Sequence, residues 1–126
     1  MGIVGVGSQI LEVARVRHLL DRHADAFLAR VFTAAEQAHC GGRVHAAEHF
    51  AAVWAAKEAT LMSLGLSWHR AIPWTDIRVH FDDARPRLEV AGGVRDAAAA
   101  QRVSAWHLTL AHCRSHATAT VIATRE

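Results

Sequence analysis

The sequence predicts a single α+β domain spanning residues 1–126, in which an antiparallel-rich sheet accompanies a long central helix. Helix formers and apolar residues run from 44 to 64, and Gly65 lies where a helix C-cap glycine is expected. Further along, four runs alternate apolar and polar residues and are separated by turn signals, as half-buried strands are. A long helix followed by paired strands indicates an α+β fold.

The first half of the chain predicts one strand and three helices. GIVGVG at residues 2–7 suits a buried strand, and its glycines allow a close approach to a neighbouring element. A helix with a basic face follows from residue 13. Thr33, with Glu36 three residues later, predicts a capping box that opens a short second helix before the long third one.

The second half predicts a hairpin, a helix and two strands. Alternating residues at 77–81 and 88–90 surround the turn sequence DDARP. A helix is expected after Gly92 and Gly93, and the runs AWHLTLAH and ATATVIAT predict the last two strands. The expected order is therefore β-α-α-α-β-β-α-β-β.

Composition excludes several classes of partner. A formal net charge of +2 is too weak to predict nucleic-acid binding across the surface. No apolar run is long enough to span a membrane, and the N-terminal residues lack the layout of a signal peptide. Cys40 and Cys113 stand in no metal-binding spacing, so we expect a cytoplasmic protein with two reduced thiols.

Two sequence motifs contain residues suited to catalysis or metal binding. In the stretch WAAKEATLMSLG, Glu58 lies on the helix face shared with Phe50, which makes it a carboxylate directed inward. One interpretation is that Lys57 or a neighbouring helix neutralises this carboxylate. The other is that the carboxylate is a metal ligand or an acid–base group. Helical periodicity does not distinguish between these two interpretations. HAAEH at 45–49 matches an inverted zinc-peptidase spacing, but without a third ligand we favour a chance match.

Four segments, in the same order along the chain, resemble the holo-acyl-carrier-protein synthases, which are small 4′-phosphopantetheinyl transferases. They are FLARVFTAAE, FAAVWAAKEATLMSLG, IPWTDIRVHFDDARPRLEV and WHLTLAHCRSHATATV. The resemblance implies the 4′-phosphopantetheinyl transferase fold and a homotrimer with active sites between its subunits. It also implies that coenzyme A donates phosphopantetheine to a carrier-protein serine, with magnesium held by an aspartate after the first strand and by the K-E-A glutamate.

Several positions match the family's motifs residue by residue. The resemblance assigns the metal-binding glutamate to Glu58, its lysine to Lys57 and the strand histidine to His112. It assigns the carrier-facing arginine of the first helix to Arg15, and Arg17 and Arg22 on the same helix would also receive an acidic carrier-protein helix.

Other positions depart from the family's motifs. GSQILEVAR stands where the family has G-x-D-[IV]-x-E-x-x-R, so Gln9 occupies the position of the metal-binding aspartate. The further replacements are Val53 for arginine, Met62 for lysine, Leu66 within G-T-G, Ala111 for serine and His116 for tyrosine. The loss of one anionic ligand and two cations removes main electrostatic contributions to a magnesium pyrophosphate site.

From these replacements we expect a repurposed enzyme that has abandoned coenzyme A and uses no cofactor. It would perform dehydration, isomerisation or cyclisation on an apolar polyketide-type substrate, free or bound to a carrier protein, in specialised metabolism. Glu58, His112 and His116 would be its acid–base groups. The expected pocket residues are Gln9, Val53, Trp54, Met62, Leu66 and Ala111.

Two alternatives stay open. The first is a genuine 4′-phosphopantetheinyl transferase that retains magnesium at Glu58 and uses coenzyme A. The second is a non-catalytic binding partner of an acyl or peptidyl carrier protein.

Overall fold

The structure, a computed structural model, describes residues 1–69, 71–82 and 85–126 and confirms the predicted α+β fold and order of elements. The strands are β1 (Gly2–Glu12), β2 (Ile77–His80), β3 (Arg87–Val90), β4 (Ala105–His112) and β5 (His116–Arg125). The helices are α1 (Val13–Val31), α2 (Ala34–Gly41), α3 (Ala46–Ser63) and α4 (Gly92–Ala100). Part of the expected DDARP turn, Asp83 and Ala84, lies outside the described residues.

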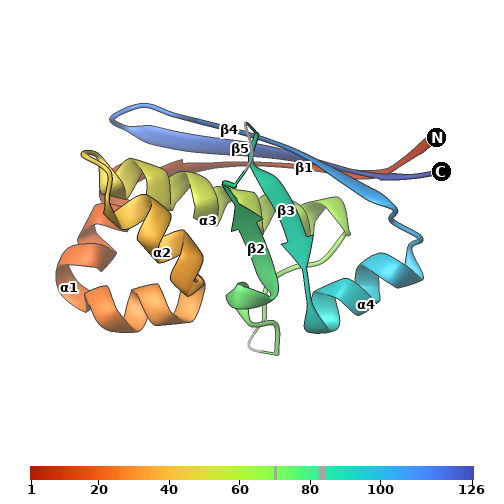
Figure 1. The fold of residues 1–126 in the computed structure, drawn as a ribbon, viewed down its shortest axis with the longest axis horizontal. Helices are drawn as coiled ribbons and strands as arrows, with labels where there is room; N and C mark the ends of the chain where they lie inside the picture. The colour runs from red at the N-terminus through yellow and green to blue at the C-terminus, as the bar shows by residue number, and fades with distance from the viewer. Residues whose placement is uncertain (70, 83–84) are drawn as a thin grey trace.

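The strands form two separate antiparallel units. One sheet has the order β1-β5-β4, and β2 pairs with β3 in a hairpin. β1 is longer than the predicted run 2–7 because it stays paired with β5 as far as Glu12, which lies opposite His116. As Figure 1 shows, α3 runs along one face of this sheet, while α1, α2 and the hairpin lie on the far side of α3.

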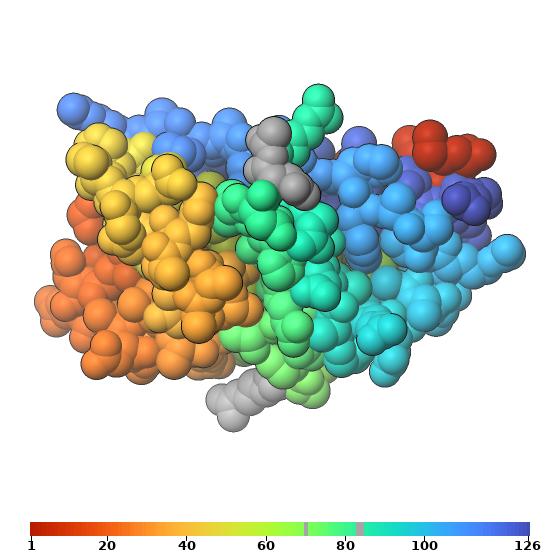
Figure 2. All heavy atoms as spheres, viewed as in Figure 1, coloured from red at the N-terminus to blue at the C-terminus, as the bar shows by residue number. Residues whose placement is uncertain are grey.

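Helix α3 is enclosed by the rest of the chain. In Figure 2 it is almost hidden behind α1, α2, the hairpin and α4. Its buried residues include Ala51, Ala55, Ala56 and Ala59, all fully shielded from solvent, and these small side chains let the sheet and the other helices approach closely. Among the described residues, no helix is both long and apolar enough to cross a membrane.

Two glycines of β1 set the distance between the sheet and α3. A methyl group at Gly5 would overlap the carbonyl of Ser63, and one at Gly7 would overlap the carbonyl of Ala59. The close approach expected of the glycine run is thus confirmed, and its neighbour is the backbone of α3. This contact places the next residues of β1 beside the middle of α3.

The predicted capping box is present, and its glutamate has a second role. The Thr33 hydroxyl accepts from the Glu36 amide, and Glu36 Oε1 accepts from the Thr33 amide at 2.8 Å. The Glu36 side chain is fully buried, and its Oε2 accepts from the Val79 amide at 2.7 Å. The same carboxylate therefore caps α2 and fixes β2.

Lys57 of α3 is the counter-ion of Glu36. Its Nζ lies 2.7 Å from Glu36 Oε1 and donates to the carbonyls of Val31, at 2.7 Å, and Trp74, at 3.3 Å. Both side chains are 0% exposed. Burial lowers the pKa of Lys57, and the Glu36 carboxylate counteracts part of that shift. One ammonium group thus joins α1, α2, α3 and the segment before β2.

Replacing Gly7 with alanine should destabilise the protein by about 3 kcal/mol, because the added methyl forces β1 away from the α3 backbone. Urea unfolding of both proteins measures this difference. The matched control is Gly41→Ala, since an added Cβ at Gly41 meets nothing within 4 Å. Equal stabilities of the two variants would contradict the close approach.

Replacing Lys57 with methionine should cost about 4 kcal/mol of unfolding free energy, because it leaves the Glu36 carboxylate buried without its cation. Chemical denaturation measures the loss. Arg95→Met on the exposed surface of α4 is the control and should change stability by less than about 0.5 kcal/mol. A Lys57→Met protein as stable as the control would refute the role given to the pair.

Candidate functional site

Glu58 lines a cavity of about 630 Å³ formed by residues of α1, α3 and β1 together with Leu66, Ser67, Trp68 and Trp74. The aromatic wall consists of Phe27, Trp54, Trp68 and Trp74. Aliphatic side chains and Met62 complete the apolar lining. The charged residues that reach it are Arg15, Arg30 and Glu58. An apolar cavity with a few converging polar groups is the usual form of a small-molecule site.

The aromatic rings of the cavity support one another. Trp68 stacks on Trp74 with ring centroids 5.6 Å apart, and Trp74 meets Trp54 edge-on at 6.3 Å. Arg15 lies over the Trp54 ring at 5.9 Å and Arg30 over Trp68 at 5.4 Å. These arginines are therefore held at the cavity wall by cation–π contacts.

Glu58 is partly buried and its hydrogen-bond partner comes from β1. Gln9 Nε2 donates to Glu58 Oε2 at 2.7 Å, and Gln9 Oε1 accepts from the Ile10 amide at 3.1 Å. Lys57 instead points to a different side of α3 and pairs with Glu36. Neutralisation of Glu58 by Lys57, one of the interpretations that the sequence left open, is therefore wrong.

A second, smaller hollow of about 250 Å³ lies between α2, α3, the hairpin and β4. His112 Nδ1 donates to Glu48 Oε1 at 2.9 Å, and the rings of His112 and His49 are 4.5 Å apart. The hydrogen bond from His112 holds the pKa of Glu48 below its ordinary value. Burial lowers the pKa of His49, and the charges of His112 and Arg43 lower it further.

The predicted site residues do not all lie together in the structure. Gln9, Trp54, Met62 and Leu66 line the large cavity with Glu58 and Arg15. Val53 is buried and borders the smaller hollow together with His112. Ala111 is exposed on β4, and His116 begins β5, where Nδ1 contacts the Ser115 hydroxyl at 2.9 Å. Within one chain the three expected acid–base groups do not meet.

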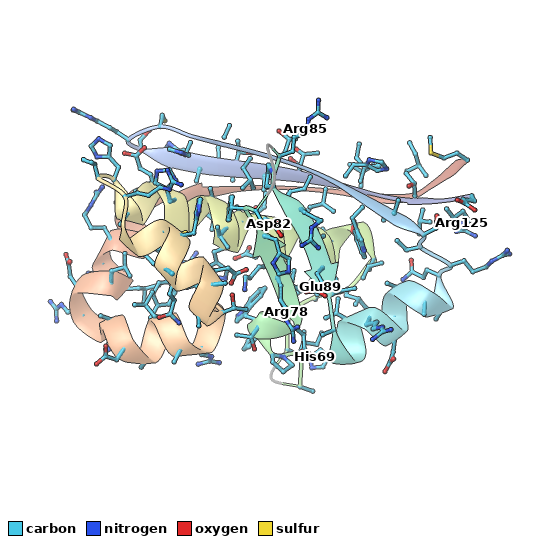
Figure 3. All side chains as sticks on the ribbon, viewed as in Figure 1. His69, Arg78, Asp82, Arg85, Glu89 and Arg125 are labelled. Atoms are coloured by element: carbon cyan, nitrogen blue, oxygen red, sulfur yellow. The ribbon has the colours of Figure 1, made fainter. Side chains whose placement is uncertain are left out.

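The basic residues of α1 also differ in position. Arg15 reaches the cavity, whereas Arg17 and Arg22 are exposed along the helix. Arg30, at the C-terminal end of the same helix, lines the cavity and was not among the predicted residues. The charged residues Arg78 and Glu89 of the hairpin do not line the cavity. They lie on the exposed surface of the hairpin, where Arg78 Nη1 is 3.9 Å from Glu89 Oε1 (Figure 3).

The cavity fits magnesium only as a site with one protein carboxylate. No cluster of three or more histidine, cysteine, aspartate or glutamate residues suited to a metal ion occurs within residues 1–69, 71–82 and 85–126. Gln9 presents its amide nitrogen to Glu58, so its oxygen is not offered to a cation. Magnesium is often held by one or two carboxylates together with substrate phosphates and water, and Glu58 meets the lower limit of that requirement.

Comparisons with known proteins give the family. The model of the 4′-phosphopantetheinyl transferase superfamily matches residues 5–121. A holo-[acyl-carrier-protein] synthase of Rhodopirellula baltica is 40% identical over 123 residues, covering 97% of this chain and 98% of the relative. One from Anaeromyxobacter dehalogenans is also 40% identical, covering 95% and 94%.

Solved structures agree on the fold. A holo-(acyl-carrier-protein) synthase of Bacillus anthracis in complex with CoA (3′,5′-ADP) has a TM-score of 0.79 and 27% identity, and the whole of both chains is covered. The synthase of Helicobacter pylori in complex with coenzyme A has a TM-score of 0.81 at 19% identity, covering 94% of this chain and 99% of that one.

These relatives overturn our first interpretation. The expectation of a repurposed enzyme for dehydration, isomerisation or cyclisation is wrong, because relatives 40% identical over nearly the full chain are holo-acyl-carrier-protein synthases. The expectation that no cofactor is needed depended on that interpretation and falls with it. The folded chain, its glutamate-containing cavity and the matching relatives agree, and the protein belongs to the 4′-phosphopantetheinyl transferase superfamily.

Proposed function

We propose that this protein transfers the 4′-phosphopantetheine group of coenzyme A to a serine hydroxyl of an acyl carrier protein. The observation that carries the proposal is the 40% identity, over 97% of this chain, to a holo-acyl-carrier-protein synthase. In the reaction the serine oxygen forms a bond to the phosphorus of the pantetheine phosphate. The pyrophosphate bond of coenzyme A breaks, adenosine 3′,5′-bisphosphate leaves and the hydroxyl proton is released.

The cavity supplies the groups that this chemistry needs. Glu58 would hold magnesium, which when bound neutralises charge on the pyrophosphate. Arg15 and Arg30 place two further positive charges beside that position. The apolar and aromatic walls suit the pantetheine arm and keep water from competing with the serine.

We propose a homotrimer as the active assembly. The sheet face opposite α3 exposes Val6 and Ile10 of β1, which lie opposite Ile122 and Thr118 of β5. This face carries mainly aliphatic and hydroxyl side chains, with His107 of β4 opposite Ile122, and its exposed aliphatic residues suit packing against copies of itself. Such an assembly would let His112 or His116 of one copy approach Glu58 of another.

The acidic partner would dock on α1. Arg15, Arg17 and Arg22 project from this helix, and Arg15 joins the docking surface to the cavity. Acyl carrier proteins that present an acidic helix would thereby bring their serine to Glu58. We also propose that the protein acts in the cytoplasm, where coenzyme A and acyl carrier proteins would both be available to it.

Mass spectrometry of an apo carrier protein incubated with the protein, magnesium and coenzyme A tests the reaction. The wild type should add one phosphopantetheine group, and Glu58→Gln should be slower by about 100-fold or more. Arg15→Glu should raise the KM for the carrier, and Glu89→Gln on the hairpin surface is the control that should leave the rate unchanged. A carrier left unmodified by the wild type would refute the proposed function.

Analytical ultracentrifugation tests the assembly. The wild type should sediment with three times the mass of one chain, and Val6→Glu should shift it towards the monomer because it buries an unpaired charge. Val44→Glu is the matched control, since Val44 is 93% exposed and lies outside the sheet. A monomeric wild type, or a Val6→Glu protein with unchanged mass, would contradict the trimer.

A further inference from the structure

The arrangement of Gln9 and Glu58 bears on how the site acquires its cation, and the inference rests on the proposed function. Gln9 Nε2 donates to Glu58 Oε2 at 2.7 Å, and the other end of the amide is anchored on the Ile10 amide at 3.1 Å. The amide is therefore held from both sides. A rotation that turned its oxygen towards Glu58 would break the first bond and place two N–H groups against each other at Ile10.

The close contact between the backbones of β1 and α3 also fixes the position of Gln9 relative to Glu58. Gly5 and Gly7 bring β1 against the carbonyls of Ser63 and Ala59, so the side chain of Gln9 meets α3 one turn before Met62. Because the contact is between backbones, β1 cannot move away to admit a different partner for Glu58 without separating the sheet from α3.

The hydrogen bond satisfies one oxygen of Glu58 without a cation. A second carboxylate at residue 9 would instead repel Glu58, and the free protein would relieve that repulsion by binding a divalent ion. The amide provides a donor where a cation would otherwise be needed. It also directs Glu58, as hydrogen bonds to ligating carboxylates commonly do, so that Oε1 is the oxygen left to bind an ion.

The charges around the cavity also disfavour the binding of a cation before coenzyme A is present. Two guanidinium groups, those of Arg15 and Arg30, line it against the single carboxylate of Glu58 among the described residues. A free divalent cation would enter a cavity of net positive charge, whereas a polyanion such as the pyrophosphate of coenzyme A is attracted. Once the phosphates are in place, they supply the oxygen ligands that the protein lacks.

We infer that Gln9 makes cation binding conditional on the donor, so that the free protein does not retain magnesium and the ion is taken up only together with coenzyme A. Gln9 is in this sense a positioning residue that acts through Glu58. By linkage, the factor by which coenzyme A raises the affinity for the cation equals the factor by which the cation raises the affinity for coenzyme A.

The test uses Mn²⁺ as the probe, with electron paramagnetic resonance measuring the free ion. Titrations are made with the wild type alone, with the wild type plus coenzyme A, and with coenzyme A alone to subtract its own weak binding. Binding by the wild type should be at least about 10-fold tighter with coenzyme A than without it. Gln9→Asp should bind Mn²⁺ without coenzyme A at least about 10-fold more tightly than the wild type.

Gln9→Asn is the matched control. It shortens the side chain as the aspartate does but keeps the amide, so it should not gain affinity for Mn²⁺ in the absence of coenzyme A. If Gln9→Asp does not fold, the two wild-type titrations still decide whether uptake of the cation depends on coenzyme A. Equal Mn²⁺ affinity with and without coenzyme A, or no binding under either condition, would overturn the inference.

The result of the Mn²⁺ titrations can be distinguished from the result of the test for carrier modification. Coenzyme A-dependent Mn²⁺ binding by a protein that leaves every apo carrier unmodified would support the inference and refute the transferase. Carrier modification by a wild type that binds Mn²⁺ equally well without coenzyme A would support the transferase and refute the inference.

Discussion

The buried ion pair of Lys57 and Glu36 joins four separate segments of the chain to the central helix. Its two side chains satisfy backbone groups from the end of α1, the start of α2, the turn at Trp74 and strand β2. These segments are far apart in the chain and would otherwise leave polar groups in an apolar interior. Because a buried charge without its partner is costly, the network favours a single arrangement of the fold.

This pair also sets the direction of Glu58. Adjacent residues of an α-helix point about 100° apart, so a lysine fixed in the core turns the following glutamate towards a different surface of α3. One charged residue of the K-E pair is thus structural, and its neighbour is available to the cavity. Two ionisable residues that are consecutive in sequence have separate environments and separate roles.

Local patterns were sufficient to predict the elements, but not which residues meet across the fold. The capping box of Thr33 and Glu36, the glycines of β1 and the cap at Gly65 each depend on neighbours in sequence or on backbone space. The pairing of Glu36 with Lys57 and of Glu48 with His112 joins residues 21 and 64 positions apart, and no periodicity reveals it. The cavity residues Trp68 and Trp74 lie outside the long helices and strands, where hydrophobic patterning gives no signal.

The functional error has a physical origin as well. Val53 and Met62 remove two charges at motif positions, but Arg30 at the end of α1 brings a cation to the cavity, and no functional role was assigned to it from the sequence although it lies within the segment FLARVFTAAE. Val53 does not line that cavity at all and borders the smaller hollow. The electrostatics of a site depend on all the groups that surround it, so the charges at a few motif positions do not determine what the site can bind.

The aromatic wall gives the molecule an optical property. Three of its four tryptophans, Trp54, Trp68 and Trp74, border the cavity, and the chain contains no tyrosine. Ultraviolet emission from the native protein therefore arises mainly from rings that an occupant of the cavity would touch, with Trp106 on β4 as the remaining emitter. The arginines stacked on Trp54 and Trp68 make that emission sensitive to charge entering beside them. The unlabelled protein thus carries its own fluorescent reporter of cavity occupancy.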